Sequence, residues 1–302
     1  MSRIPDEVRR LAEERARRRA ARDFAAADRL RERIGEAGFQ VVDRPGGGYD
    51  LAPAAPEEPR PLEAAEVPSV LDRPPDAEWS IHWLHEGWAQ DVLRGMASFG
   101  ATARGRAVHQ VVVESVAGDV TWPEDVEVIR LSGDPGFGAA RNAGLRRSRG
   151  RLVAVVDGSV EAEGDAFGPL EEALMDPAVG VAGPVGVVTD DLREFRESPG
   201  PEVDAVEGYL MAFRREVLSG GVAFDPKFRF YRAADIDLSF QIKAMGLRAV
   251  RVDVPIRRHE HRRWARVPAD RRGALSKRNM YRFLDRFRGR TDLLVGPENA
   301  EP

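Results

Sequence analysis

The 302-residue chain contains no cysteine, and it has no apolar run long enough to span a bilayer. The lack of cysteine excludes disulfides and thiolate metal sites, and it suits the cytosol. No signal-peptide pattern precedes the charged first residues, so we expect a cytoplasmic protein, with peripheral attachment at the inner face of the membrane as the alternative. Arginine far outnumbers lysine, which we attribute to coding bias, so a single arginine is weak evidence of function.

Composition divides the chain into four parts. Residues 51–77 are rich in proline, alanine and glutamate and have few large apolar side chains, which predicts a flexible linker. We therefore expect a small module over residues 1–50, this linker, one large domain over residues 78–292, and a tail over residues 293–302.

The most informative segment runs from Asp134 to Glu161. Two glycines, the first of them Gly136, allow close backbone approaches in a loop. Apolar residues at helical spacing predict a helix over Ala139–Ser148, and the β-branched run Leu152–Val156 is typical of a strand buried in a parallel sheet. Asp157 follows that strand, at the edge where open α/β sheets bind ligands.

This segment resembles the nucleotide-sugar half of a family-2 glycosyltransferase of the GT-A type. In that family a loop of the form N-x-G-F-x-x-A-R-N-x-G opens a helix packed behind a strand that ends in D-x-D. The matching residues are Gly136, Phe137, Ala140, Arg141, Asn142 and Gly144. Asp134 stands where the family usually has asparagine.

A second set of matches, farther along the chain, resembles the acceptor half of the same family. Its members are Glu207, Gly208, Arg214, Arg215, Phe224, Asp225, Phe228, Asp235, Asp237, Leu238 and Gly246. Two motif sets in the right order are more specific than either alone. The resemblance covers residues 78–290 and implies an α/β, Rossmann-like GT-A fold with a mostly parallel sheet. Residues 275–287 also resemble a carboxyl-terminal helix of members that transfer rhamnose or galactofuranose.

The resemblance also implies where the nucleotide-sugar donor and a metal bind. In the family the D-x-D acids contact the ribose and a divalent cation, Mn²⁺ or Mg²⁺, and a late histidine often completes the coordination. Carboxylate oxygens suit such hard cations. The implied donor-binding residues are Glu114, Gly136, Arg141, Asn142 and Asp157, and the implied metal ligands are Asp157, Ser159 and His259.

Two positions in the metal set have alternatives. The D-x-D motif reads D-G-S over residues 157–159, so its second acid is missing, and either Ser159 through a water molecule or Glu161 would have to replace it. His259 and His261 lie two apart on an expected strand, so both would face the same side. Counting from Gly246 places the family's metal-binding histidine at His259, whereas counting from Pro255 slightly favours His261.

Asp235 matches the first acid of the family's E-D-x-D motif and is implied as the catalytic base. It would take the proton of an acceptor hydroxyl as that oxygen attacks the anomeric carbon opposite the diphosphate, which gives inversion. Asp237 lies two residues on and would point elsewhere on a helix. The alternative role for Asp235 is a charge that complements the helix dipole.

The resemblance therefore predicts transfer of a sugar from a nucleotide-diphosphate donor to a hydroxyl of a saccharide or lipid-linked acceptor. The alternative is a catalytically inactive GT-A scaffold that binds nucleotide or a partner. That partner could be RNA bound through the amino-terminal hairpin. The D-G-S sequence in place of D-x-D, together with Ala234 in place of the family's glutamate before Asp235, keeps this alternative open.

The amino-terminal residues form a pattern of their own. Apolar stripes predict a helical hairpin broken near Arg22–Asp23, with Gly38 at the end of the second helix and a small β-hairpin after it. This segment resembles the carboxyl-terminal module of cysteinyl-tRNA synthetases through Arg19, Arg22, Asp23, Phe24, Ala27, Asp28, Arg31 and Gly38. In the synthetases the module helps contact tRNA. We favour a docking or oligomerisation role here, with tRNA contact as the alternative.

The carboxyl-terminal part is strongly basic. Residues 257–290 hold thirteen basic residues against three acids, around a helix with an apolar stripe. A basic amphipathic helix of this type binds anionic lipid or a polyprenyl-phosphate acceptor. Packing of the stripe onto the large domain is the alternative that we favour.

Overall fold

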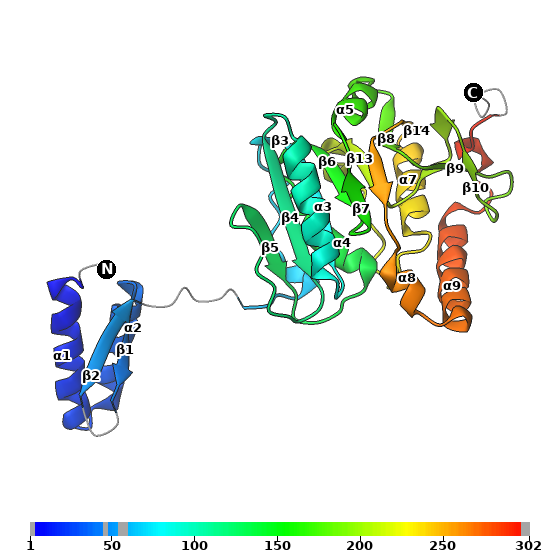
Figure 1. The fold of residues 1–302 in the computed structure, drawn as a ribbon. Coiled ribbons are helices and arrows are strands. Elements are labelled where there is room, and N and C mark those ends of the chain that lie inside the picture. The colour runs from blue at the N-terminus through cyan, green and yellow to red at the C-terminus, as the bar shows by residue number, and fades with distance from the viewer. Residues whose placement is uncertain (1–3, 45–47, 54–59, 297–302) are drawn as a thin grey trace. The chain divides into compact units, whose positions relative to one another are not determined.

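The computed structural model describes residues 4–44, 48–53 and 60–296. The chain forms two compact units, residues 1–59 and residues 60–302 (Figure 1). Each unit has a core of its own.

The small unit is a helical hairpin followed by a two-stranded antiparallel sheet, as the sequence predicts. Its elements are α1 (Asp6–Ala20), α2 (Phe24–Glu36), β1 (Phe39–Asp43) and β2 (Tyr49–Pro53). Arg22 adopts a left-handed backbone with φ of 60°, and the Asp23 carboxylate accepts a hydrogen bond from the Ala26 amide. These two residues end the first helix and cap the second, which explains the predicted break.

The core of the small unit consists of Val8, Ala12, Ile34 and Val41. Arg15 is buried beside it and donates two hydrogen bonds of 2.8 and 2.9 Å to the Asp43 carboxylate. Phe24 was expected in the apolar stripe but is the first residue of α2 and is 56% exposed. The buried stripe of α2 therefore begins at Ala27.

The large unit is built on an eight-stranded, mixed but mostly parallel sheet. The strand order is β11-β14-β8-β13-β6-β3-β4-β5 (Figure 1). The bounds are β3 (Ala77–His85), β4 (Val108–Glu114), β5 (Val126–Arg130), β6 (Gly150–Val156), β8 (Val179–Gly183), β11 (Glu202–Val203), β13 (Leu210–Arg214) and β14 (Arg248–Arg251). Strand β13 runs antiparallel between β6 and β8, whereas β3, β4, β5 and β6 are parallel.

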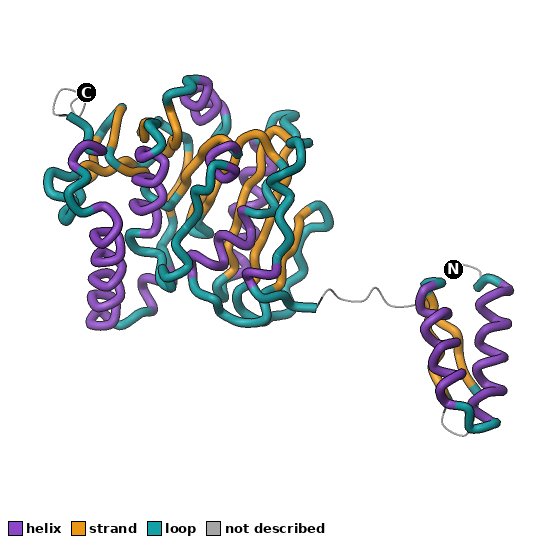
Figure 2. The backbone as a smooth tube through the Cα atoms, turned by 180° about the vertical axis from the view of Figure 1, so that it is seen from behind, coloured by secondary structure: helices purple, strands orange, loops and turns teal. Residues whose placement is uncertain are grey.

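Helices cover both faces of this sheet (Figures 1 and 2). They are α3 (Ala89–Thr102), α4 (Phe137–Leu145), α5 (Gly168–Met175), α6 (Glu216–Ser219), α7 (Ala234–Ala244), α8 (Arg262–Arg266) and α9 (Ala269–Phe287), with short 3₁₀ turns at Ala64–Glu66 and Thr291–Leu293. Two small sheets pair β9 (Gly186–Val188) with β10 (Arg196–Ser198) and β12 (Ala205–Val206), and β7 (Val160–Ala162) with β15 (Ile256–Arg258).

Side chains of strand β6 point alternately to the two faces of the sheet and so contribute to two hydrophobic cores. Leu152, Ala154 and Val156 join the core under α3 and α5, whereas Val153 and Val155 join the core under α4 and α7. The predicted helix Ala139–Ser148 corresponds to α4, which begins at Phe137 and ends at Leu145. The predicted α/β GT-A architecture is therefore confirmed.

The prediction of a flexible linker over residues 51–77 is wrong for most of that segment. Residues 60–76, which we call the strap, belong to the large unit. Leu62 bridges to Leu131, while Val67 and Val70 are buried. The low content of large apolar residues misled the prediction, because side chains as small as Ala64 and Val67 are buried in one cluster with residues of the sheet and α4. Residues 54–59 lie outside the described part of the chain.

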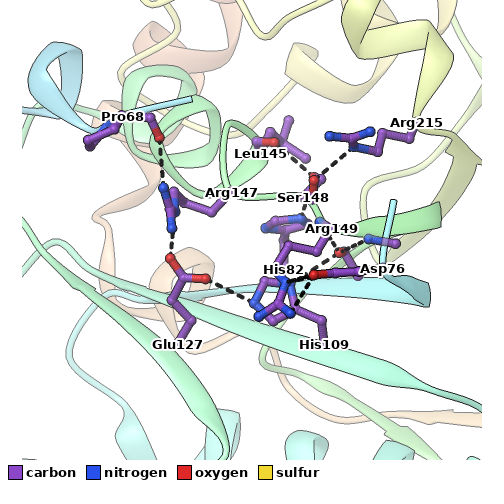
Figure 3. A network of polar contacts seen from close by, with 12 residues as sticks. Pro68, Asp76, His82, His109, Glu127, Leu145, Arg147, Ser148, Arg149 and Arg215 are labelled. Atoms are coloured by element: carbon purple, nitrogen blue, oxygen red, sulfur yellow. Dashed lines mark hydrogen bonds and ion pairs between the residues drawn. The ribbon is translucent and has the colours of Figure 1, made fainter. Parts of the chain in front are cut away.

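Four arginines of the large unit bind the strap through its backbone carbonyls and one acid. Figure 3 shows two of these contacts, Arg147 with Pro68 and Arg149 with Asp76. Arg215 donates to the carbonyls of Val70 and Arg73 and, through Nε, to the carbonyl of Ser148 at 2.8 Å. The other three contacts are Arg146 with the Ala64 carbonyl, Arg147 with the Pro68 carbonyl, and Arg149 with the Asp76 carboxylate.

A similar correction applies to the expected tail over residues 293–302. Leu293 is buried, and the Val295 amide donates to Asp204 at 2.6 Å, so the domain extends to the end of the described residues at 296. The apolar stripe of α9 packs on the domain as we favoured, through Phe283, Leu284 and Phe287 against Phe240 of α7. Within the described ranges no helix is long and apolar enough to cross a membrane.

Candidate active site

Two cavities meet at the carboxyl ends of the central strands, and they share Asp157 and His261. We call the first the Asp235 cavity; its walls include Phe137, Arg141, Asp157, Glu207, Tyr209, Phe224, Tyr231, Asp235 and His261. We call the second the Trp88 cavity; its walls include Leu84, Glu86, Trp88, Asp91, Asp157, Ser159, His261, Arg262 and Arg263. The shared pair therefore lies between two spaces that could each hold part of a ligand.

Asp157 is placed there by the sheet. It follows β6, and its amide donates to the Tyr209 carbonyl just before β13. Its Oδ1 accepts hydrogen bonds from the amide and hydroxyl of Ser159, and its Oδ2 lies 3.2 Å from His261 Nε2. Burial alone would raise the pKa of Asp157, but the hydrogen bonds from His261 and Ser159 outweigh it and lower the pKa to about 2.

The structure brings His261, and not His259, to Asp157. The expected strand ends at Arg258, so the two histidines do not share a strand face. His261 caps α8, where its Nδ1 accepts from the Trp264 amide, which leaves the proton on Nε2 for Asp157. His259 instead pairs with Glu161 at 2.7 Å. The chain turns between them because α8 begins at Arg262.

The metal ligands expected around Asp157 are only partly assembled. The Ser159 hydroxyl donates to Asp157, and Glu161 is bound to His259. In the part of the chain that the structure describes, no three His, Cys, Asp or Glu side chains form a group that could hold a metal ion. The protein donors next to both cavities are therefore the Asp157 carboxylate and the His261 imidazole, whose Nε2 would have to lose its proton to bind a cation.

Arg141 lies beneath the Asp235 cavity and ties two strands together. Its guanidinium donates to the carbonyls of His82 on β3 and Val156 on β6, at 3.0 and 3.1 Å. Complete burial lowers its pKa to about 10. Arg141 thus fixes the two strand ends on either side of the cavity and places a buried positive charge below Asp157.

The other three predicted donor residues do not line either cavity. Gly136 begins α4 with φ of 90°, and a Cβ there would lie 2.9 Å from the Arg229 Cα. The Asn142 side chain makes two hydrogen bonds with the Phe224 backbone, which join the two motif sets. Glu114 is buried and bound by Trp122 and Arg130. These residues shape the scaffold of the site.

Asp235 lines the same cavity as Asp157 and lies in the first turn of α7. Its Oδ2 accepts from the Gly208 amide at 2.8 Å and its Oδ1 from the Ile236 amide at 2.9 Å. Burial raises the pKa of this carboxyl. Asp237 points away, as predicted, and its carboxylate is bound by Gln241 and Arg286.

Sequence reasoning gave no role to three residues that line the Asp235 cavity. Glu207 was recognised only as a motif match, and Tyr209 and Tyr231 had no signal of their own. The Tyr231 ring stacks on the His261 imidazole with centroids 4.3 Å apart. The signal that could have identified Glu207 is its position immediately before Gly208, at the mouth of a buried strand.

Ala233, the residue before α7, is strained. Its φ is 62°, in the left-handed region, where a non-glycine residue costs about 1–2 kcal/mol. We expect Ala233→Gly to raise the free energy of unfolding by roughly 0.5–1 kcal/mol after the entropic cost of glycine, measured by thermal melting. The matched control is Ala234→Gly, inside the helix, which should lower stability. A lower melting temperature for Ala233→Gly would contradict the assigned strain.

Residues 110–252 match the model of the family described as glycosyl transferase family 2. The large unit is a GT-A domain. A solved structure with this fold is GalNAc-T7 with UDP, GalNAc and Mn²⁺, at a TM-score of 0.56 and 16% identity. That match covers 69% of this chain but only 48% of the other, so the chain spans about half the length of that protein.

A second similar structure is the mannosyltransferase PcManGT from Pyrobaculum calidifontis in complex with GDP-Man and Mn²⁺. Its TM-score is 0.49 at 18% identity, and the match covers 66% of this chain and 62% of that one. Among proteins with curated functions, no sequence matches this chain. The GT-A match includes Asp157 and Asp235, whereas His261 lies beyond the matched residues of the family model.

Proposed function

We propose that the large unit transfers a sugar from a nucleotide-diphosphate donor to a hydroxyl group of an acceptor, with inversion. The observation that carries this proposal is that Asp157 and His261 line two adjoining cavities, one of which Asp235 also lines. The nucleotide would occupy the Trp88 cavity, and the reacting sugar carbon would lie at the shared pair. The attacking hydroxyl would approach from the side of Asp235.

The donor side of the proposal rests on Asp157 and His261. A divalent cation that bound there would neutralise charge on the departing diphosphate. Mg²⁺ is commonly held by one or two protein carboxylates together with substrate phosphates and water, so two protein donors suffice. The two similar structures were both solved with Mn²⁺. Arg262 and Arg263 also line the Trp88 cavity, where they pair with Asp91 and Glu86 and would be the positive charges available to a diphosphate.

The acceptor side rests on Asp235 as the base. As the acceptor oxygen forms its bond to the anomeric carbon, the bond to the diphosphate oxygen breaks and the hydroxyl proton passes to Asp235. The raised pKa of this buried carboxyl makes it a stronger proton acceptor, and the Gly208 amide holds it in place. Attack by the acceptor oxygen on the face of the anomeric carbon opposite the departing diphosphate would produce inversion.

Nucleotide binding tests this proposal directly. We expect calorimetry to detect UDP, GDP or dTDP, or one of their sugars, at micromolar to millimolar affinity in the presence of Mn²⁺. Asp157→Asn should weaken that binding about tenfold or more, because it removes a charge opposite the cation. The control Asp190→Asn changes an exposed aspartate away from both cavities and should bind normally. No binding of any nucleotide at millimolar concentration would contradict the proposal.

A second candidate is an inactive GT-A scaffold, and Ser159 in place of the second D-x-D acid is the observation that favours it. Such a protein would bind nucleotide without turnover. We further propose that the small unit is a docking element, with tRNA contact as the alternative, and that the protein is cytoplasmic. The arginines of residues 257–290 would then give peripheral membrane contact. The rhamnosyl or galactofuranosyl type remains a proposal that rests on residues 275–287 alone.

A further inference from the structure

A second carboxylic acid faces the acceptor side of the Asp235 cavity. Glu207 lies immediately before Gly208, whose amide is bonded to Asp235, so the two acids are attached to neighbouring points of the same wall. The Glu207 amide is fixed to the Val185 carbonyl at 2.9 Å. Asp157 lines both cavities, whereas Glu207 and Asp235 line only this one, which places them on the side away from the nucleotide.

The Glu207 side chain is half-buried, yet it makes no hydrogen bond or ion pair with the described residues 4–44, 48–53 and 60–296. In the walls of the Asp235 cavity the other two acids are engaged, Asp157 with His261 and Asp235 with the Gly208 and Ile236 amides. Polar groups that lose water normally gain a partner in exchange. An acid left free in a cavity is therefore available to a ligand.

The surroundings of Glu207 select the chemistry of that ligand. Aromatic rings of Phe137, Tyr209, Phe224 and Tyr231 line the same cavity and offer flat apolar faces. Two arginines lie in the cavity wall: Arg141 is bound to two backbone carbonyls, and Arg232 is exposed, 5.5 Å from the Trp264 ring centroid. Arg258 is also exposed and lies 4.8 Å from the Tyr209 ring centroid. An uncharged ring with many hydroxyl groups complements aromatic faces and a free carboxylate, whereas a phosphate beside Glu207 would face the negative charges of Glu207 and Asp235.

We propose that Glu207 is an acceptor-specificity residue that accepts a hydrogen bond from an acceptor hydroxyl, so that the Asp235 cavity takes an uncharged sugar ring and rejects a phosphate group. This inference rests on the proposed function, since it assigns the acceptor of the same site. It selects the saccharide over a polyprenyl-phosphate acceptor. Glu207 acts beside the base and does not replace it.

The charge on Glu207 depends on pH in the physiological range. Burial and the neighbouring Asp235 raise its pKa to about 7, with Glu197 acting in the same direction and Arg232 and Arg258 opposing it. Below that pH the carboxyl is neutral and a weaker hydrogen-bond acceptor. Sugar affinity should therefore fall as pH drops from 8 to 6, and this dependence should vanish in Glu207→Gln.

Saturation-transfer NMR of the full chain tests the inference without any donor. The probes are the methyl glycosides of glucose, galactose, mannose and rhamnose, with the 6-phosphates of glucose, galactose and mannose as competitors. We expect at least one glycoside to bind the wild-type protein at pH 8. The same glycoside should bind the Glu207→Gln variant about tenfold more weakly. The matched control is Glu197→Gln, an exposed acid outside the cavity, which should bind like wild type.

Equal affinity in wild type and Glu207→Gln, binding of no glycoside, or stronger competition by the sugar phosphates than by the parent sugars would each overturn the inference. The nucleotide calorimetry is independent of these results. A protein that binds nucleotide but no glycoside refutes the role of Glu207 and leaves the proposed function standing. A protein that binds a glycoside through Glu207 but binds no nucleotide refutes the proposed function and leaves the role of Glu207 in sugar binding standing.

Discussion

Asp235→Asn is expected to lower kcat about 10²–10⁴-fold while donor affinity changes little. The exchange is nearly isosteric, and it removes the oxygen that would take the proton of the acceptor hydroxyl. Asp235 also accepts hydrogen bonds from the amides of Gly208 and Ile236, and asparagine has one acceptor oxygen for the two. We therefore expect a loss of about 1–3 kcal/mol in the free energy of unfolding as well, which thermal melting would record.

Asp237→Asn is the matched control for that variant. Asp237 lies two residues on in the same helix, is buried, and pairs with Arg286 away from the cavity. It should lose stability while keeping turnover per folded molecule, so the comparison separates chemistry from folding. Turnover like that of wild type in Asp235→Asn would remove the base assignment. No turnover of the parent protein with any donor would favour the inactive scaffold.

The second large effect concerns where the domain begins. Removing residues 1–59 should leave a cooperatively folding protein, whereas removing residues 1–75 should cost roughly 3–6 kcal/mol, or about 10–20 °C in melting temperature. The longer deletion exposes the surface that Val67 and Val70 cover. It also takes two backbone carbonyl partners from the buried Arg215 guanidinium.

Both truncations lack the whole small unit, so the difference between them isolates the strap. Melting followed by circular dichroism for the two truncations and the full chain gives the comparison. Equal melting temperatures for the two truncations would show that the strap contributes nothing. A loss of cooperative melting on removal of residues 1–59 alone would show that the small unit belongs to the core.

Local signals in the sequence were sufficient for the elements that surround the site. The β-branched run before Asp157 predicted a buried strand, which is β6. The glycine loop earlier in the chain predicted the start of α4 to within two residues. The period of the apolar residues predicted the helical hairpin, and Arg22–Asp23 marked its break. The opposite directions of Asp235 and Asp237 followed from helical geometry.

The sequence did not predict which side chains contact one another, because those contacts join segments that lie far apart in the chain. His261 rather than His259 reaches Asp157 because the chain leaves β15 and turns into α8, a turn with no strong composition signal. Glu114, Gly136 and Asn142 match a donor motif, but Trp122, Arg229 and Phe224 occupy the space around them.

The sequence by itself determined the fold class, the two modules and the strand end that carries Asp157, because periodicity and turn residues act within a few positions of each other. Only the tertiary structure decided that residues 60–76 are bound, that Glu207 lies free in a cavity, and that Asp157 pairs with His261. Burial, pairing and the pKa values that follow from them arise between residues distant in the chain. No local pattern of amino acids encodes them.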